Sequence, residues 1–123
     1  MKISKAIEQA RALKSGYVLS DEQLRRYIDT AETLILSEIV NGREGDEEIL
    51  STYEPDGSGD RELFAPKPYE DIYVQYCATQ IDLLGEEGDR YINDSIVFKD
   101  SFQGLKRYWW KTHRQKKSFQ YHF

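Results

Sequence analysis

The feature that most constrains the fold is a row of mostly apolar and aromatic residues in the last third of the chain. Its members are Tyr91, Ser95, Phe98, Phe102, Leu105 and Trp109, which follow one another at alternating steps of four and three residues. This alternation places side chains along one face of an α-helix and is typical of helices that pack side by side at shallow angles. The row therefore predicts a long helix over residues 87–114 that buries this face against other helices.

Three shorter helices are predicted upstream of this one. The first, over residues 3–14, has its expected buried residues at Ile3, Ile7, Ala10 and Leu13. The second spans residues 21–40, because Ser20 can cap its first turn and Gln23 completes a capping box. The third spans residues 68–84, because Pro68 suits the first turn of a helix. Its expected buried face consists of Tyr69, Ile72, Tyr73, Tyr76, Cys77, Ile81 and Leu84.

These patterns predict an all-α fold, a small four-helix bundle-like domain that occupies residues 1–114. One domain also suits the length of 123 residues. The core is expected to draw on the second, third and fourth helices. Its predicted members are Leu24, Tyr27, Ile28, Leu34, Ile35, Ile72, Tyr73, Tyr76, Ile81, Phe98, Phe102, Leu105 and Trp109. Gly104 interrupts the fourth helix and favours either a bend or a close approach of a neighbouring helix.

A long irregular segment, residues 41–67, separates the second predicted helix from the third. It is rich in glycine, proline and acidic side chains, and loops of this length in compact domains are usually functional or disordered. A short β-hairpin that pairs residues 48–53 with residues 61–64 would fit the turn sequence "PDGSG". We expect acidic residues of this excursion to face a channel or a neighbouring protein. They are Glu44, Asp46, Glu47, Glu48, Glu54, Asp56 and Asp60.

The sequence carries no constellation of residues typical of an enzyme. Its two histidines and single cysteine share no motif, and it has neither a phosphate-binding glycine loop nor an HExxH pair. The segment "DGSGD" lacks the ligand spacing of a calcium loop and predicts a turn. We therefore expect no catalytic activity, no metal site and no cofactor. Apolar runs are too short to cross a bilayer, and the first residues do not form a secretion signal, so no membrane contact is expected.

Charge is distributed unevenly along the chain. The net charge is -5, yet residues 106–123 hold six of the 17 bases and no acid. Such a split favours an interaction tail, although bases also suit the C-terminal end of a helix dipole. We predict a docking tail over residues 115–123 that continues from the end of the fourth helix. The predicted docking residues are Trp110, Lys111, Arg114, Lys116, Lys117, Phe119, Tyr121 and Phe123. Nucleic-acid binding is a weaker alternative, because the rest of the chain is acidic.

The order of these features resembles the small head-tail connector proteins of tailed bacteriophages and prophages. The opening "ISKAIEQARALKSG" and "LSDEQLRRYIDTAETLILSEIV" is similar to the start of that family. The entry "LFAPKPYEDIY", the "RYIN" step and the ending "RYWWKTH" resemble its habitual pattern. The resemblance covers nearly the whole chain except the acidic excursion. These motifs describe packing and turns rather than a catalytic signature.

The resemblance implies an α-helical adaptor in the virion, made in the host cytoplasm. Such adaptors form a homo-oligomeric ring, commonly a dodecamer, that joins the portal protein to the next connector or tail-terminator protein. The ring extends the channel through which DNA passes without specific binding. The C-terminal segment, here from about Lys111 to Phe123, would reach the portal, although the final "KKSFQYHF" has no counterpart in the family pattern. A monomeric or dimeric helical interaction module of phage origin is the alternative.

Overall fold

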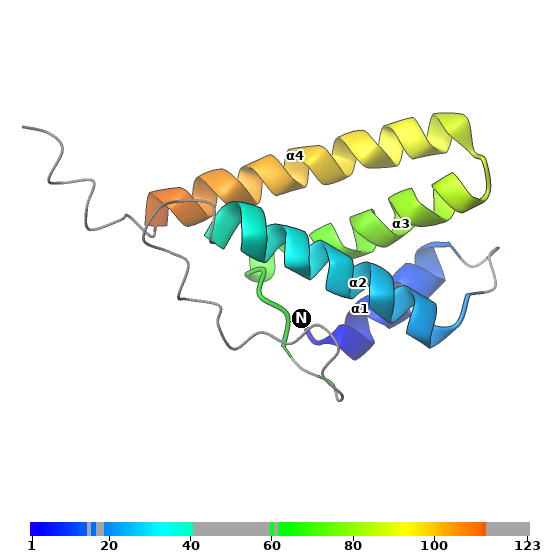
Figure 1. Cartoon of the computed structure of the whole chain (residues 1–123), viewed down its shortest axis with the longest axis horizontal. Helices are drawn as coiled ribbons and strands as arrows, with labels where there is room; N and C mark the ends of the chain where they lie inside the picture. Colours follow the sequence, from blue (N-terminus) through cyan, green and yellow to red (C-terminus); the bar gives the residue numbers. More distant parts are fainter. Residues whose placement is uncertain (15, 17–18, 41–59, 61, 113–123) are drawn as a thin grey trace, which may run out of the picture.

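The computed structural model describes residues 1–14, 16, 19–40, 60 and 62–112 of the chain. In these residues the fold is all-α, as the sequence predicts, with four α-helices and no strand. The helices are α1 (Ile3–Leu13), α2 (Asp21–Ile35), α3 (Ile72–Leu84) and α4 (Gly88–Thr112). In Figure 1, α3 and α4 form an antiparallel hairpin, and α2 and α1 lie against its lower side. None of the described helices combines the length and the apolar composition that a bilayer-spanning segment needs.

α2 begins where the capping residues predict and changes its winding near its end. The hydroxyl of Ser20 accepts a hydrogen bond from the backbone amide of Gln23, at 3.1 Å. After Ile35 the chain continues as a π-helical turn, η1 (Leu36–Val40). Leu36, Ile39 and Val40 are all buried in this turn. The predicted helix over residues 21–40 therefore has the expected extent, but its last five residues are not α-helical.

The entry to the helical hairpin is a 3₁₀ turn. Pro66 precedes η3 (Lys67–Tyr69), which contains Pro68, and α3 follows from Ile72. Pro68 therefore sits in this short turn, where a missing amide costs nothing, rather than in the first turn of α3. The turn between α3 and α4 places Glu86 at a φ of 55°, a left-handed conformation that non-glycine residues seldom adopt.

α3 is the central helix of the fold, because it packs against α1, α2 and α4. Its buried residues are Ile72, Tyr73, Val74, Cys77, Ala78, Thr79, Ile81 and Asp82. They surround the helix instead of following one stripe. The prediction that Leu84 belongs to a single buried face is wrong, since its side chain is 61% exposed at the end of the hairpin. Leu13 at the end of α1 is likewise 59% exposed, whereas Ile3 and Ala10 are buried as predicted, together with Ala6.

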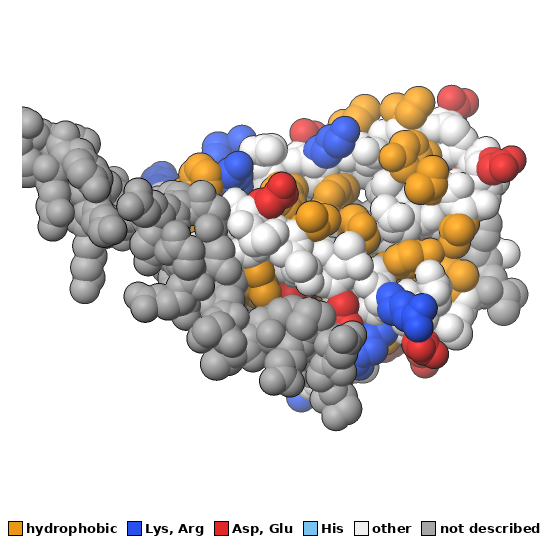
Figure 2. All heavy atoms as spheres, viewed as in Figure 1, with side chains coloured by type: hydrophobic (Ala, Val, Ile, Leu, Met, Phe, Trp, Pro, Cys, Tyr) orange, Lys and Arg blue, Asp and Glu red, His pale blue; other side chains and the backbone are white. Residues whose placement is uncertain are grey.

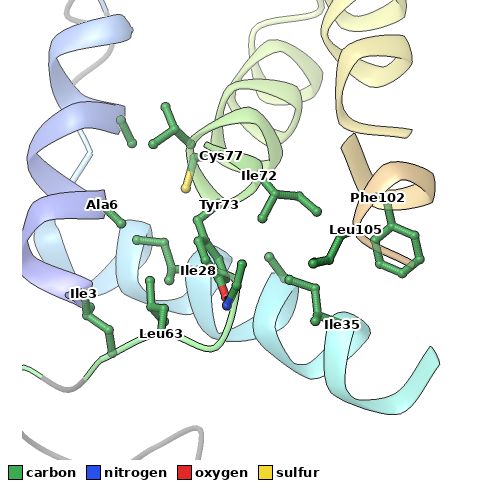
Figure 3. Packing of buried hydrophobic residues seen from close by; sticks show 14 of the residues in the cluster. Ile3, Ala6, Ile28, Ile35, Leu63, Ile72, Tyr73, Cys77, Phe102 and Leu105 are labelled. Carbon is green, nitrogen blue, oxygen red and sulfur yellow. The ribbon is translucent and has the colours of Figure 1, made fainter. Parts of the chain in front are cut away.

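The core lies around α3 and is completed by residues of α1, α2 and α4 (Figure 3). Figure 3 shows Tyr73 pointing toward Ile28, while Ile72 lies near Ile35 and Leu105. The predicted core residues that are buried are Leu24, Ile28, Ile35, Ile72, Tyr73, Ile81, Phe102 and Leu105. The others are partly buried and pack against this cluster: Tyr27, Leu34, Tyr76, Phe98 and Trp109. Leu63 and Ala65, from the end of the predicted excursion, also enter the core.

The end of the excursion pairs with the beginning of the chain. The amide of Leu63 donates to the carbonyl of Met1 at 2.8 Å, and Glu62 forms an isolated antiparallel bridge with Lys2. This pairing differs from the hairpin predicted for residues 61–64. The other half of that hairpin, residues 48–53, lies outside the described residues. The described end of the excursion thus pairs with the two residues that precede α1.

Candidate docking surfaces

A buried carboxylate fixes the segment that leads into the helical hairpin. Glu32 of α2 is 1% exposed, and its side chain accepts hydrogen bonds from the amide of Phe64 and the hydroxyl of Tyr73. The same hydroxyl accepts a hydrogen bond from the amide of Ala65, at 2.9 Å. Since buried polar groups are costly unless paired, this network holds residues 64–65 against α2 and α3. The last part of the excursion is therefore fixed to the helical domain by hydrogen bonds.

A second polar cluster joins three helices at the opposite end of α3. Lys14, just after α1, places its ammonium 2.8 Å from the carboxylate of Asp82 in α3 and 3.2 Å from that of Asp94 in α4. Asp82 is fully buried, whereas Asp94 is partly exposed. Burial and a hydrogen bond with Asp94 raise the pKa of Asp82 above its usual value. We call this cluster the Lys14 clasp, because one cation neutralises a buried acid and links α1 to the hairpin.

The two other groups of the Lys14 clasp are shifted in directions that favour their charged forms. Burial acts to lower the pKa of Lys14, but its hydrogen bonds with Asp82 and Asp94 raise the pKa above the ordinary value. Burial acts to raise the pKa of Asp94, yet its hydrogen bonds with Asp82 and Lys14 hold the pKa below the ordinary value. The clasp therefore has a structural role, since all its charges are engaged with one another.

Asp60 is the one predicted excursion acid among the described residues, and it caps α1. Its carboxylate accepts hydrogen bonds from the amide of Ser4 at 2.8 Å and from the hydroxyl of Ser4 at 2.7 Å. The hydrogen bond from the Ser4 amide lowers the pKa of Asp60. An acid at the N-terminal end of a helix also suits the helix dipole. The side chain is exposed at the same time, so it stays accessible to other molecules.

The end of α4 is anchored to the rest of the domain by two tryptophans. The indole of Trp110 donates to the carbonyl of Ile39 at 2.8 Å, and the ammonium of Lys106 lies 4.7 Å from the centre of the same ring. The ring of Trp109 meets that of Phe64 edge to face, with centroids 4.8 Å apart. Trp110, a predicted docking residue, is therefore half-buried and fixed against η1.

The predicted docking residues fall partly within the described chain. Lys111 is exposed on the last turn of α4. Arg114, Lys116, Lys117, Phe119, Tyr121 and Phe123 lie outside the described residues, as does the whole predicted tail. The excursion acids Glu44, Asp46, Glu47, Glu48, Glu54 and Asp56 lie outside them as well. Of the predicted docking residues and excursion acids, the structure therefore describes three: Asp60, Trp110 and Lys111.

The structure reveals an apolar surface that the sequence predictions missed. Large aliphatic side chains are exposed at the tip of the hairpin and along the first half of α4. They are Leu83 at 56%, Leu84 at 61%, Ile92 at 56%, Ile96 at 53% and Val97 at 46% exposure. Figure 2 shows hydrophobic side chains gathered on one face over this half of α4 and between α4 and α2. Exposed aliphatic residues gathered in this way often mark an interaction site.

A shallow hollow continues this apolar surface along α4. It has a volume of about 300 Å³ and is lined by Leu34, Glu38, Phe98, Lys99, Phe102 and Gln103. The hollow is lined by residues of α2, η1 and α4, which include three apolar side chains, one acid and one base. A second hollow of about 480 Å³ lies over α1 and the start of α2. Both are open surface depressions and neither encloses a set of catalytic side chains.

The described residues show no site for metal or cysteine chemistry. In residues 1–14, 16, 19–40, 60 and 62–112, no three acids, histidines or cysteines gather as ligands. Cys77 is buried, and this burial raises the pKa of its thiol to about 12, which keeps it protonated and unreactive at neutral pH. No protein-family model matches the chain, and no curated protein or solved structure does either.

Proposed function

We propose that this protein is a structural adaptor at the head-tail interface of a phage or prophage virion. In this proposal it forms a ring that joins the portal to the next connector or tail component and extends the DNA channel. The observation that carries the proposal is the exposed aliphatic surface of the hairpin tip and α4 on a domain whose own core is well packed. A subunit that completes its burial by assembly needs such a surface.

The charge distribution supports the same proposal. The body of the chain is acidic, with all 22 acids before residue 106, and a channel lined by acids would let DNA slide without adhering. The excursion acids are assigned to this lining or to a neighbouring connector. The basic, aromatic segment at the end of the chain is assigned to the portal, beginning at Lys111 on the exposed last turn of α4.

The experiment uses capsids that carry the portal protein encoded in the same genome, and matched capsids without a portal. We expect the full chain to sediment with the portal-bearing capsids alone. A chain truncated after residue 114 should keep its helical circular dichroism but no longer sediment with them. Equal sedimentation with both kinds of capsid, or with neither, contradicts the adaptor function. Normal attachment of the truncated chain contradicts the role assigned to the tail while leaving the adaptor function intact.

A further inference from the structure

α4 carries a second row of residues directly beside the row that packs into the core. The core-facing row is Tyr91, Ser95, Phe98, Phe102, Leu105 and Trp109, and the second begins one residue later with the same steps of four and three. We call it the outer row: Ile92, Ile96, Lys99, Gln103, Lys106 and Trp110. The first four members are exposed and the last two are half-buried. Residues at this spacing form one continuous strip on a helix, of the kind that a second helix can follow.

The two halves of the outer row lie beside charges of opposite sign. The first half, which we call the tip surface, combines Ile92 and Ile96 with the nearby acids Glu86, Glu87 and Asp89. Arg90 also lies there and pairs with Glu87 at 3.5 Å, so the three acids outweigh the one base and the tip surface stays negative through Glu86 and Asp89. The second half, which we call the basic surface, combines Lys106 and Trp110 with Arg107 and Lys111, and no acid occurs between residues 101 and 112. The isoleucines of the tip surface and the residues of the basic surface lie on one continuous helix, which sets the separation of the two surfaces along α4.

The basic surface is ordered before any partner arrives. The hydrogen bond from Trp110 to Ile39 fixes the indole ring against η1, and Lys106 stands over the ring at 4.7 Å. A lysine held over an aromatic ring loses little further freedom on binding, and its aliphatic stem can cover an apolar side chain of a partner. The basic surface thus offers a flat ring and two alkyl stems beside positive charges, which complements two isoleucines beside negative charges.

We infer that the tip surface of one copy of this chain docks on the basic surface of a second copy. The acids of one surface meet the bases of the other at the rim, while Ile92 and Ile96 cover the stems and the ring at the centre. The inference rests on the proposed function in one respect, because it identifies the contact that would build the ring. Each copy keeps a free tip surface on one side and a free basic surface on the other, so head-to-tail docking continues until a ring closes.

Charge reversal on the two surfaces tests this docking with the full chain. One variant carries Glu86→Lys and Asp89→Lys, and the other carries Arg107→Glu and Lys111→Glu. Each should self-associate about 100-fold more weakly than the unaltered chain, because like charges then face each other at the rim. The equimolar mixture should regain association, since each variant supplies the surface that the other has lost. Native mass spectrometry and analytical ultracentrifugation measure both effects, and circular dichroism checks that both variants are folded.

The matched control reverses two exposed charges on α1, with Lys5→Glu and Glu8→Lys, and should associate like the unaltered chain. Charge variants that associate normally, or a mixture that stays dissociated, would overturn the inference. The inference is also wrong if the unaltered chain remains monomeric up to about 1 mM, a concentration at which even weak complexes form.

Cysteine cross-linking gives an independent measurement, because the native Cys77 is buried and unreactive. Ile92→Cys mixed with Arg107→Cys should give mainly mixed disulfide dimers on mild oxidation. Dimers formed mainly between two Ile92→Cys chains would show that like surfaces meet, which overturns head-to-tail docking. These tests need no capsid, so a chain that self-associates this way but ignores portal-bearing capsids would refute the proposed function alone. Capsid attachment that is unaffected by the charge variants would refute this inference alone.

Discussion

α3 and α4 are partners in one hairpin, yet they are buried to very different extents. α3 has 13 residues, and the buried ones lie on several sides of the helix. α4 has 25 residues, of which Phe102 and Leu105 are buried. The difference follows from position, because α3 contacts three other helices, whereas α4 packs mainly against α3. The more apolar α3 therefore buries its side chains within the domain, whereas α4 leaves Ile92, Ile96 and Val97 exposed.

The largest expected effect comes from the same substitution made once on each helix. Ile81→Ala in α3 should lower the free energy of unfolding by about 2–5 kcal/mol, because it leaves a cavity around a residue that is 2% exposed. Ile96→Ala in α4 should change it by less than about 0.5 kcal/mol, because that side chain is 53% exposed. Denaturant unfolding of the monomeric chain measures both. Equal losses for the two variants would show that α4 is as much a core helix as α3.

Helical periodicity was enough to predict the fold class and most of the core. Four apolar stripes gave four helices with ends close to those observed, and eight of the predicted core residues are buried. Leu13 and Leu84 are each the last residue of their helix and are 59% and 61% exposed. Periodicity gives the side of a helix on which a residue lies, but not how far along the helix its neighbours extend. Periodicity also gives no warning that Glu32 and Asp82 are interior, because their partners come from other helices.

The candidate surfaces were harder to predict, although one signal was available. The outer row of α4 repeats the steps of the inner row one residue later, starting with Ile92 and Ile96. From the sequence alone either row could be the one that packs into the core, and the larger number of aromatic residues favours the row from Tyr91 to Trp109. The structure decides between them, because it shows Phe102 and Leu105 buried and the two isoleucines exposed. The half-buried position of Trp110 was also unforeseeable, since it depends on a carbonyl at the end of η1.

The next largest effect concerns the Lys14 clasp, the polar link that ties both hairpin helices to α1. Lys14→Met should lower the free energy of unfolding at pH 7 by roughly 2–3 kcal/mol, because it leaves the buried carboxylate of Asp82 without its cation. The loss is smaller than for a completely buried pair, since Asp94 keeps 32% of its side chain exposed. Lys5→Met, on the exposed side of α1, is the control and should be nearly neutral.

The pH dependence of this variant follows from the directions of the pKa shifts. The pKa of Asp82 is already raised, and loss of Lys14 raises it further, so the variant gains protons and stability as the pH falls below 7. The gap to the unaltered chain should therefore narrow toward acid pH. In the unaltered chain, the raised pKa of Lys14 means that its contribution is complete below its ordinary value of 10.5 and is lost at higher pH. A gap that is constant from pH 4 to 7 would contradict burial of the Asp82 charge.

The smallest expected effect concerns Gly104, which faces the ring of Tyr69. A β-carbon at Gly104 would lie 3.2 Å from the ring of Tyr69, in the η3 turn. Alanine gains up to about 1 kcal/mol over glycine inside a helix, but here the half-buried ring must shift to make room. We therefore expect Gly104→Ala to change the free energy of unfolding by less than about 0.5 kcal/mol.

A double-mutant cycle separates these two opposing contributions. In a Tyr69→Ala background the ring is absent, so Gly104→Ala should stabilise by nearly the full helix-propensity gain of about 1 kcal/mol. Equal effects of Gly104→Ala in both backgrounds would show that the ring imposes no constraint. A coupling of the expected sign would instead mean that Gly104 allows η3 to approach α4 closely. This approach would add to the packing against α3 that already holds most of α4 on the domain.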